Sequence, residues 1–175
     1  MTIGDKHIID TVRTNPESGF RLLLTKYKKP IYWHIRRIVV GHDDAQDAAQ
    51  ETFVRVFRNF SSCKSGDKLR GWIFRIATNE ALRMLDKRKS TTLSLDDEAT
   101  NIAGQTIADP YFDNSDKAAV MLQKAILSLP TKQQLTFNLR YYDEMTYDDI
   151  AEVIGSTASA AKMNYHIAKD KIVKF

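Results

Sequence analysis

Apolar side chains in the first half of the chain recur every three or four residues, the spacing of one face of an α-helix. A first set comprises Phe20, Leu23, Leu24, Tyr27, Ile31, Ile35 and Ile38. Gly41 interrupts the pattern. Asp43 and Asp44 are suited to start a second helix, because side-chain oxygens and negative charge satisfy free backbone N–H groups there. We expect this helix to run to about Asn59 and to bury Ala49, Phe53, Val56, Phe57 and Phe60.

The rest of the chain divides into a further helix, a polar stretch and a second helical block. A loop over 61–67 precedes a helix that is expected to begin near Leu69 or Gly71 and to end at Lys89. Periodicity is then lost until residue 117, and Ser, Thr, Asp and Gly become frequent, which predicts a flexible linker. The next helix stops before Pro130, which can open another with a core face of Leu135, Leu139 and Tyr142.

This pattern predicts an all-α chain of two small helical domains, residues 1–92 and 117–175, joined by residues 93–116. With 7 Gly and 4 Pro in 175 residues, the composition also suits helices better than a turn-rich β fold. Charge is divided unevenly. Residues 1–92 carry 18 Lys and Arg against 10 Asp and Glu, whereas the connector is acidic. A basic first domain favours a polyanionic partner, although a basic solvated surface explains the charge equally well.

Residues 146–173 have the pattern of a helix-turn-helix. Thr146 and Asp149 have the spacing of a capping box, Gly155 supplies a tight turn, and Thr157 can cap a second helix. The predicted buried positions are Tyr147, Ile150, Ala151, Ile154, Ala161, Tyr165, Ala168 and Ile172. The outward face of the second helix then carries Ser159, Lys162, Met163, His166 and Lys169. Polar and basic residues there are those that meet base edges and phosphates in a major groove, and an ordinary helical hairpin is the alternative interpretation of the same pattern.

Two polar faces are predicted in the first domain. Asp47, Gln50 and Glu51 share one side of their helix, and a solvated surface is the simplest interpretation of that side alone. A basic row repeats every four residues on the next helix, after Trp72, and comprises Arg75, Asn79, Arg83 and Lys87. Charge for phosphates, a ring for stacking and an amide for a base edge are what single-stranded nucleic acid needs. The same pattern also fits a solvated face with Trp72 in the core.

Other functions are disfavoured by the residues present. Cys63 is the only cysteine, so an internal disulfide is excluded and a Cys-based zinc site is not expected. No apolar run is long enough to span a bilayer and no signal peptide is visible, so we expect a cytoplasmic chain without membrane insertion. We find no Gly-rich phosphate loop, metal-ligand cluster or nucleophile–base pair. No enzymatic activity, catalytic residue, metal or cofactor is therefore expected.

Three stretches together resemble the extracytoplasmic-function (ECF) group of the sigma-70 family of RNA polymerase sigma factors. Residues 43–57 (DDAQDAAQETFVRVF) resemble region 2.2, and residues 71–81 (GWIFRIATNEA) resemble regions 2.3 and 2.4. Leu129-Pro130, residues 139–142 (LRYY) and residues 145–151 (MTYDDIA) resemble region 4. The order and spacing also agree. The resemblance implies a transcription initiation factor that carries core polymerase to promoters and helps to open them, with a sigma-2 and a sigma-4 domain.

The resemblance also implies roles for individual residues. Asp47, Gln50 and Glu51 would contact the clamp coiled coil of the β′ subunit, and the β flap is a further expected partner. The −10 element would be bound by Cys63, Lys64, Lys68, Arg75, Asn79, Arg83 and Lys87. The −35 element would face Ser159, Lys162, Met163, His166, Ile167 and Lys169. Regulation by an anti-sigma protein is also implied.

The main alternative is a repressor or activator that uses the helix-turn-helix without binding polymerase. Such a protein would not need the polar face at residues 47–51 or the basic row of the first domain. A pure interaction module is a third reading. Binding to core polymerase distinguishes the sigma factor from these alternatives.

Overall fold

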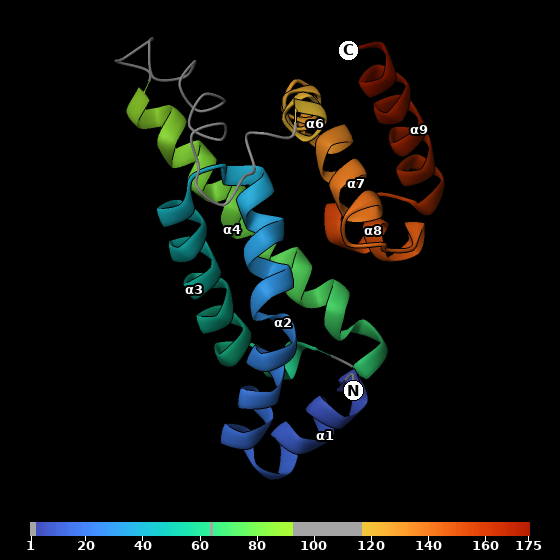
Figure 1. Ribbon diagram of the computed structural model, residues 1–175. Helices are drawn as coiled ribbons and strands as arrows, with labels where there is room; N and C mark the ends of the chain where they lie inside the picture. The colour runs from blue at the N-terminus through green and yellow to red at the C-terminus, as the bar shows by residue number, and fades with distance from the viewer. Residues whose placement is uncertain (1–2, 64, 93–116) are drawn as a thin grey trace.

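The computed structural model describes residues 3–63, 65–92 and 117–175, and of residues 88–92 only the backbone. Across these ranges the regular elements are all helices, which confirms the predicted all-α class. A first unit contains α1 (Asp5–Thr14), α2 (Pro16–Val39), α3 (His42–Arg58), the short 3₁₀ helix η1 (Phe60–Ser62) and α4 (Gly66–Thr92). A second unit contains α6 (Lys117–Leu127), α7 (Thr131–Tyr141), α8 (Tyr147–Ile154) and α9 (Ala158–Lys174) (Figure 1).

Helix α1 was not anticipated from the sequence. It buries Ile8, Ile9 and Val12 against the bundle. Its first residue, Asp5, accepts hydrogen bonds from Lys26 Nζ at 2.6 Å and from the Tyr27 hydroxyl at 2.7 Å. Gly19 allows α1 and α2 to approach closely, because a Cβ atom there would lie 2.4 Å from Val12 Cγ2. Burial, reinforced by the hydrogen bond to Asp5, raises the pKa of the Tyr27 phenol.

Helix α3 differs from its prediction in two ways. It begins at His42, and its N-cap is Gly41, which makes no side-chain cap bond, so Asp43 and Asp44 lie within the first turn. The carboxylates therefore act on the helix dipole rather than as caps. Phe57, expected in the core, is 39% exposed. Because α3 packs against both α2 and α4, it buries Ala45, Ala48 and Thr52 as well as the predicted Phe53 and Val56. The predicted Ala49 and Phe60 are only partly buried.

The expected polar loop before α4 is shorter than predicted. η1 takes up residues 60–62, and α4 begins at Gly66 rather than near Leu69. Leu69, Ile73, Phe74 and Ala77 are fully buried and fix this helix against α2 and α3. Arg75, Asn79, Arg83 and Lys87 lie on the exposed side of the same helix.

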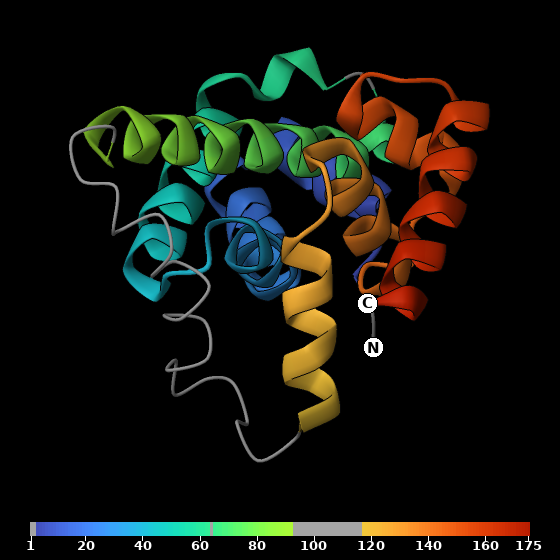
Figure 2. The same cartoon turned by 90° about the horizontal axis from the view of Figure 1, so that it is seen from above.

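The second unit packs directly on the first. Leu139, Met145 and Ile150 are fully buried in the same apolar cluster that forms the core of the first unit. Figure 2 shows α8 beside the first half of α4, and these two helices make the main contact between the units. A smaller cluster around Ile126, Phe137 and Ala168 belongs to the second unit alone. The predicted linker, residues 93–116, lies outside the described residues, and the domain bounds remain a prediction.

The predicted caps and turn of the helix-turn-helix are confirmed. Its buried positions agree in part: Val153 is buried although it was not predicted, and a set of predicted positions is only partly buried, namely Tyr147, Ile154, Tyr165 and Ile172. Thr146 caps α8 by accepting a hydrogen bond from the Asp149 backbone N–H at 3.2 Å, and Thr157 caps α9 through the Ala160 N–H at 3.1 Å. Gly155 sits between the helices with φ 68° and ψ 48°, the left-handed conformation that favours glycine. Of the helices described, none is both long and apolar enough to cross a membrane.

Candidate nucleic-acid interface

The outward face of α9 is exposed as predicted. Ala161 and Ala168 are buried against the rest of the unit, which turns the other side of the helix to solvent. That side presents Ser159, Lys162, Met163, His166, Ile167 and Lys169. Met163 is 65% exposed and Ile167 is 38% exposed. A capped helix that shows basic, polar and apolar side chains on one free face has the chemistry needed to read a major groove.

The basic row of α4 is also exposed along one side of its helix. Arg75, Asn79, Arg83 and Lys87 all lie on the surface. Arg83 Nη1 donates a hydrogen bond to Glu80 Oε1 at 2.7 Å, while half of its side chain remains open to solvent. The row therefore offers cationic side chains on both sides of the Asn79 amide. This geometry suits a strand whose phosphates are held while one base is read.

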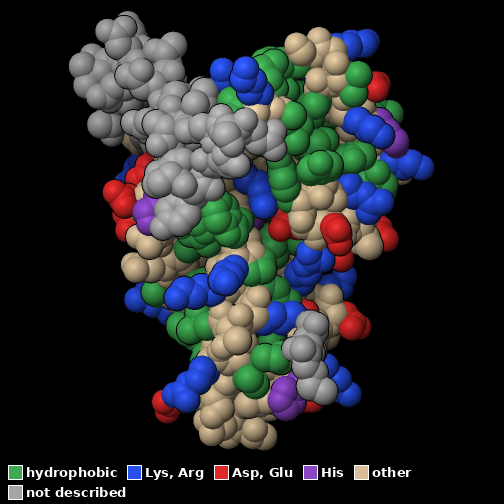
Figure 3. All heavy atoms as spheres, in the orientation of Figure 1, with side chains coloured by type: hydrophobic (Ala, Val, Ile, Leu, Met, Phe, Trp, Pro, Cys, Tyr) green, Lys and Arg blue, Asp and Glu red, His purple; other side chains and the backbone are tan. Residues whose placement is uncertain are grey.

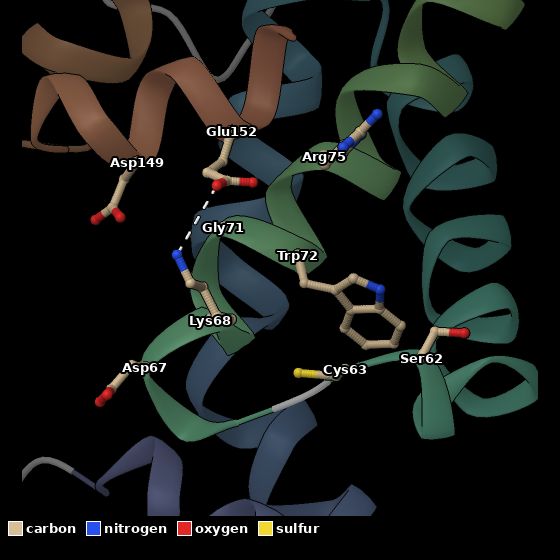
Figure 4. Close-up of a pocket in the computed structure, with 9 residues that line it drawn as sticks. All are labelled: Ser62, Cys63, Asp67, Lys68, Gly71, Trp72, Arg75, Asp149 and Glu152. Carbon is tan, nitrogen blue, oxygen red and sulfur yellow. Dashed lines mark ion pairs between the residues drawn. The ribbon is translucent and has the colours of Figure 1, made fainter. Parts of the chain in front are cut away.

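A cavity of about 410 Å³ opens at the start of this row (Figure 4). Its lining residues come from both units and are Ser62, Cys63, Asp67, Lys68, Gly71, Trp72, Arg75, Asp149 and Glu152. Trp72 is half-buried, and its ring packs edge-on to Phe60 with centroids 6.0 Å apart. The indole thus supports the core with one part and borders the cavity with another, and its role in stacking on a base stays a prediction.

The structure brings together only some of the residues predicted for the −10 site. Lys68, Trp72 and Arg75 border the cavity, but Asn79 is not among its lining residues. Cys63 lines it while remaining 8% exposed, and its Sγ donates to the Ser65 carbonyl at 3.6 Å. Burial, opposed in part by that hydrogen bond, raises the pKa of the Cys63 thiol. Lys64 lies outside the described residues.

The predicted polar face of α3 is divided by the structure. Gln50 borders an apolar groove of about 920 Å³ between α2 and α3, together with Leu24, Phe53 and Phe57. Lys28 and Lys29 stand at the same groove. Asp47 is exposed but is not among the residues that line it. Figure 3 shows that Lys and Arg side chains are spread over both units on the face in view, rather than gathered in one patch.

Glu51 pairs with Arg55 of its own helix and is not among the residues that line the groove. Its Oε1 lies 3.4 Å from Arg55 Nε, which in turn lies 2.5 Å from Glu80 Oε1. Glu80 is nearly buried, and it also binds Arg83. Four alternating charges therefore connect α3 with the basic row of α4. Sequence reasoning missed Glu80, because an acid inside a basic helix gives no sign of its partners.

A second set of charged groups lies where the two units meet. Asp143, in the turn after α7, is 7% exposed in its side chain. Its Oδ2 lies 3.9 Å from Arg37 Nη1 and 3.8 Å from His34 Nδ1. Arg70 donates a hydrogen bond to the Asp143 backbone carbonyl. The Arg37 guanidinium stacks over the Tyr142 ring at 4.1 Å.

The protonation of this cluster follows from burial. Desolvation raises the pKa of Asp143 to about 6, although the Arg37 and Arg70 cations oppose the change. Desolvation, aided by the Arg37 charge, lowers the pKa of His34 to about 3. The Thr78 hydroxyl donates to the Phe74 carbonyl, so we assign the proton of neutral His34 to Nε2, which bonds Thr78 Oγ1 at 2.7 Å. Its bare Nδ1 then faces Asp143.

His34, Arg37, Arg70 and Asp143 were not singled out from the sequence, and nothing local marks them. Each stands in an ordinary helical or turn context, and the atoms meet only when α2, α4 and the α7–α8 turn are assembled. In the described part of the chain, His, Cys, Asp and Glu do not form a group of three or more that could hold a metal ion.

Comparison with protein families gives two matches in chain order. Residues 23–91 match Sigma-70 region 2, and residues 119–172 match Sigma-70, region 4. The chain is 28% identical to the ECF RNA polymerase sigma factor SigW of Bacillus subtilis (strain 168), over 99% of this chain and 97% of that protein. It is 24% identical to the RNA polymerase sigma-H factor of Pseudomonas aeruginosa, over 97% and 92% of the two chains.

Solved structures share the architecture. CnrH in complex with the cytosolic domain of CnrY aligns with a TM-score of 0.72 and 18% identity, covering 97% of this chain and 95% of that chain. The sigma factor RpoE from Bartonella quintana, in complex with the anti-sigma factor NepR, aligns with a TM-score of 0.70 and 19% identity, covering 89% and 94%. The order and packing of the helices described above are therefore those of a known fold.

Proposed function

This chain belongs to the sigma-70 family, in its extracytoplasmic-function group, and we propose that its exposed surfaces divide the tasks of binding core RNA polymerase and promoter DNA. As a sigma factor it acts in transcription initiation. The assignment of tasks to surfaces is argued from exposure, charge and the shape of each site. No catalytic step is assigned to the chain.

The polymerase surface is the α2–α3 groove with the outer side of α3. The groove combines exposed apolar area at Phe57 with the Gln50 amide and the Lys28 and Lys29 cations. An amphipathic helical element of the partner fits such a groove, and we assign it to the clamp coiled coil of the β′ subunit. Asp47 and Glu51 would contact its edge. The β flap would contact the second unit.

The −10 surface consists of Lys68, Trp72, Arg75, Asn79 and Arg83, with Lys87 continuing the row. The cavity beside Trp72 can receive an unstacked base, because it offers a ring edge and polar side chains within one recess. The cations of the row would hold the neighbouring phosphates. Cys63 would contribute the floor of the recess. Asn79, one turn beyond Arg75, would contact the next nucleotide along the strand.

The −35 surface is the outward face of α9, from Ser159 to Lys169. Lys162 and His166 lie one turn apart near the middle of that face and are exposed. This face carries no acidic residue among those named, so it can approach phosphates. The Thr157 cap fixes the direction of the N-terminus of the helix. Met163 and Ile167 offer apolar contact to thymine methyl groups.

The chain acts in the cytoplasm under this proposal, where core polymerase and promoter DNA are found. Both solved relatives reported above are complexes, one with an anti-sigma factor and one with the cytosolic domain of CnrY. By analogy with these complexes, we expect an anti-sigma protein to bind the present chain. The α2–α3 groove is open for such a partner as well.

The observation that carries the proposal is the exposed basic row of α4 with the Trp72 cavity at its start, since a duplex-binding repressor needs neither. Purified chain and core polymerase should direct initiation from a subset of a promoter library. Lys162→Ala should lower promoter affinity by about 1–3 kcal/mol and alter sequence preference if Lys162 reads a base. A chain that binds duplex DNA but never core polymerase would instead be a helix-turn-helix regulator.

A further inference from the structure

We propose that α1 is a buttress for the −10 recess, the cavity beside Trp72, and that Gly66 and Asp5 are positioning residues for that recess. The inference rests on the proposed function, which assigns base capture to the recess. It goes further by naming an element outside the recess that sets its shape. Helix α1 also lies outside residues 23–91, the part of the chain that matches Sigma-70 region 2.

The first turns of α1 and α4 meet backbone to backbone (Figure 1). A Cβ atom added at Gly66 would lie 2.9 Å from Lys6 Cα and 3.0 Å from Lys6 N. Both Lys6 atoms belong to the backbone, so no side-chain rotation can relieve the overlap. Glycine at position 66 therefore allows the two helices to approach this closely. Because Lys6 belongs to α1, the position of α1 limits where α4 can begin.

The residues next to this contact form part of the recess wall. Cys63 and Lys68 line the recess together with Trp72 (Figure 4). Cys63 Sγ donates a hydrogen bond to the Ser65 carbonyl at 3.6 Å, and the Lys68 backbone N–H donates to the same carbonyl at 3.1 Å. The Ser65 carbonyl therefore links two lining residues immediately before Gly66 in the chain. A displacement of Gly66 would move both of them.

Helix α1 is itself fixed to α2 near both of its ends. At its start, the Tyr27 hydroxyl lies 2.7 and 2.8 Å from the two Asp5 carboxylate oxygens, and Lys26 Nζ donates to Oδ1 at 2.6 Å. Tyr27 is 2% exposed, so loss of Asp5 would leave a nearly buried hydroxyl without this acceptor. At the other end, Val12 makes the close approach to Gly19 described above. Because both ends are fixed, α1 can resist displacement of α4.

The Asp5 carboxylate also lies close enough to the recess for its charge to act there. Burial is the main cause of the raised pKa of Cys63, and the Asp5 charge adds to it. The pKa of the Tyr27 phenol is raised chiefly by burial and by its hydrogen bond to Asp5, and Cys63 adds a smaller effect. Helix α1, helix α2 and the residues before α4 thus form one connected group.

Gly66→Ala should displace the start of α4 from α1. An ordinary contact of a Cβ atom begins at 3.4 Å, so the two backbones must separate by about 0.5 Å. Alanine otherwise favours a helix more than glycine does, so the substitution by itself does not weaken α4. Gly4→Ala is the matched control, because a Cβ atom there meets nothing within 4 Å and the φ of −75° suits alanine. Thermal unfolding followed by circular dichroism verifies that both variants fold.

The first experiment measures base discrimination by the holoenzyme. Core polymerase with each variant transcribes a promoter library randomised over the −10 and −35 elements, and the transcripts are counted by sequencing. Gly66→Ala should lower the ratio between the best and the worst base at the most selective −10 position by about tenfold, because a small displacement within such a site costs a large factor. Preferences in the −35 element should stay as in wild type, and Gly4→Ala should match wild type throughout. A uniform loss of transcription with unchanged −10 ratios is what a folding defect alone produces, and it would overturn the buttress.

A second pair of variants tests the buttress even if Gly66→Ala does not fold. Asp5→Ala removes the acceptor of the Tyr27 hydroxyl, whereas Asp5→Asn keeps a side-chain oxygen for it. Asp5→Ala should lower the same −10 ratio by about tenfold, and Asp5→Asn should retain most of it. Equal −10 ratios in wild type and Asp5→Ala would contradict the role of α1.

Two further measurements distinguish failure of the buttress from failure of the proposed function. Trp72→Leu removes the ring that borders the recess. If Trp72→Leu lowers the −10 ratio and Gly66→Ala does not, the recess reads the base and only the buttress is overturned. If Trp72→Leu leaves the ratio unchanged, the assignment of base capture to the recess is itself wrong.

Fluorescence then tests the buttress without DNA. Trp33→Phe leaves Trp72 as the only indole of the chain, so acrylamide quenching reports the access of solvent to the recess. Adding Gly66→Ala should change the Stern–Volmer constant of Trp72, whereas adding Gly4→Ala should not. A constant unchanged by Gly66→Ala would show that α1 does not shape the recess.

Discussion

Arg55 of α3 and Glu80 of α4 form an ion pair in which Arg55 Nε lies 2.5 Å from Glu80 Oε1. Glu80 also holds Arg83, and Arg55 also meets Glu51. Through this pair, Glu51 of the proposed polymerase surface is connected to Arg83 of the proposed −10 surface. It fixes the Arg83 side chain along α4 before any DNA is bound.

Replacement of Glu80 should destabilise the first unit. The Glu80 side chain is 7% exposed and accounts for contacts to two guanidinium groups. Glu80→Gln removes the charge at nearly constant volume and should lower the free energy of unfolding by about 1–3 kcal/mol. Glu17→Gln is the matched control, because the Glu17–Arg21 pair is exposed and its loss should cost less than about 1 kcal/mol. Urea unfolding of both variants measures the difference, and equal losses would contradict the argument.

The α2–α3 groove should contribute to polymerase affinity. Gln50 and Phe57 both border the groove and are exposed. The double variant Gln50→Ala/Phe57→Ala should weaken binding to core polymerase by about 1–3 kcal/mol, because it removes an amide and an aromatic contact together. Asp10→Ala, an exposed position on α1, serves as the control. If the double variant binds core polymerase as tightly as wild type, the polymerase-binding surface is not this groove.

Asn79 should matter for promoter opening and not for polymerase binding. Its amide offers a donor and an acceptor to a base edge, and it stands between Arg75 and Arg83 on the exposed row. With Asn79→Ala, permanganate reactivity of unpaired thymines should fall on a duplex promoter. On a template already mismatched at the −10 region, the reactivity should recover if Asn79 mainly assists opening. A base-dependent defect that persists there would show that Asn79 reads the flipped base. If thymine reactivity with the Asn79→Ala variant equals that with wild type on both templates, Asn79 is not part of the −10 site.

His34 and Asp143 should give opposite contributions to stability below neutral pH. The folded-state pKa of Asp143 is raised to about 6, so its contribution is full at low pH and is lost as the pH rises through 6. The folded-state pKa of His34 is lowered to about 3, so its contribution is present above 6.5 and is lost as the pH falls. In wild type the two effects oppose one another between pH 7 and pH 5.

Single variants separate these two effects. Relative to pH 7, His34→Gln retains the Asp143 effect and should gain about 1 kcal/mol at pH 5, whereas Asp143→Asn retains the His34 effect and should lose about 2 kcal/mol. Gln at position 34 can still donate to Thr78, which preserves that hydrogen bond. Urea unfolding at both pH values measures each difference against wild type. The same pH response in both variants would show that these groups do not titrate as described.

Much of the fold was determined locally and could be predicted. Helical spacing located α2, α3, α4 and the second unit, because the burial of one face requires an apolar residue every turn. The helix-turn-helix was predicted to its caps, since Thr146, Thr157 and Gly155 act on neighbouring backbone groups. The exposed face of α9 followed directly, as did the basic row of α4. Helix α1 was missed, because its few apolar positions make sense only once α2 and Gly19 are in place.

Only the tertiary structure determined which residues from distant parts of the chain contact one another. Arg70 and Asp143 are 73 positions apart in the chain, and no periodicity or capping pattern connects them. That Gln50 borders a groove while Arg55 of the same helix pairs with Glu80 depends on how α3 lies between two other helices. Local sequence patterns govern contacts within a few residues. The pairing of charges across units depends on packing, which depends on the whole set of buried side chains at once.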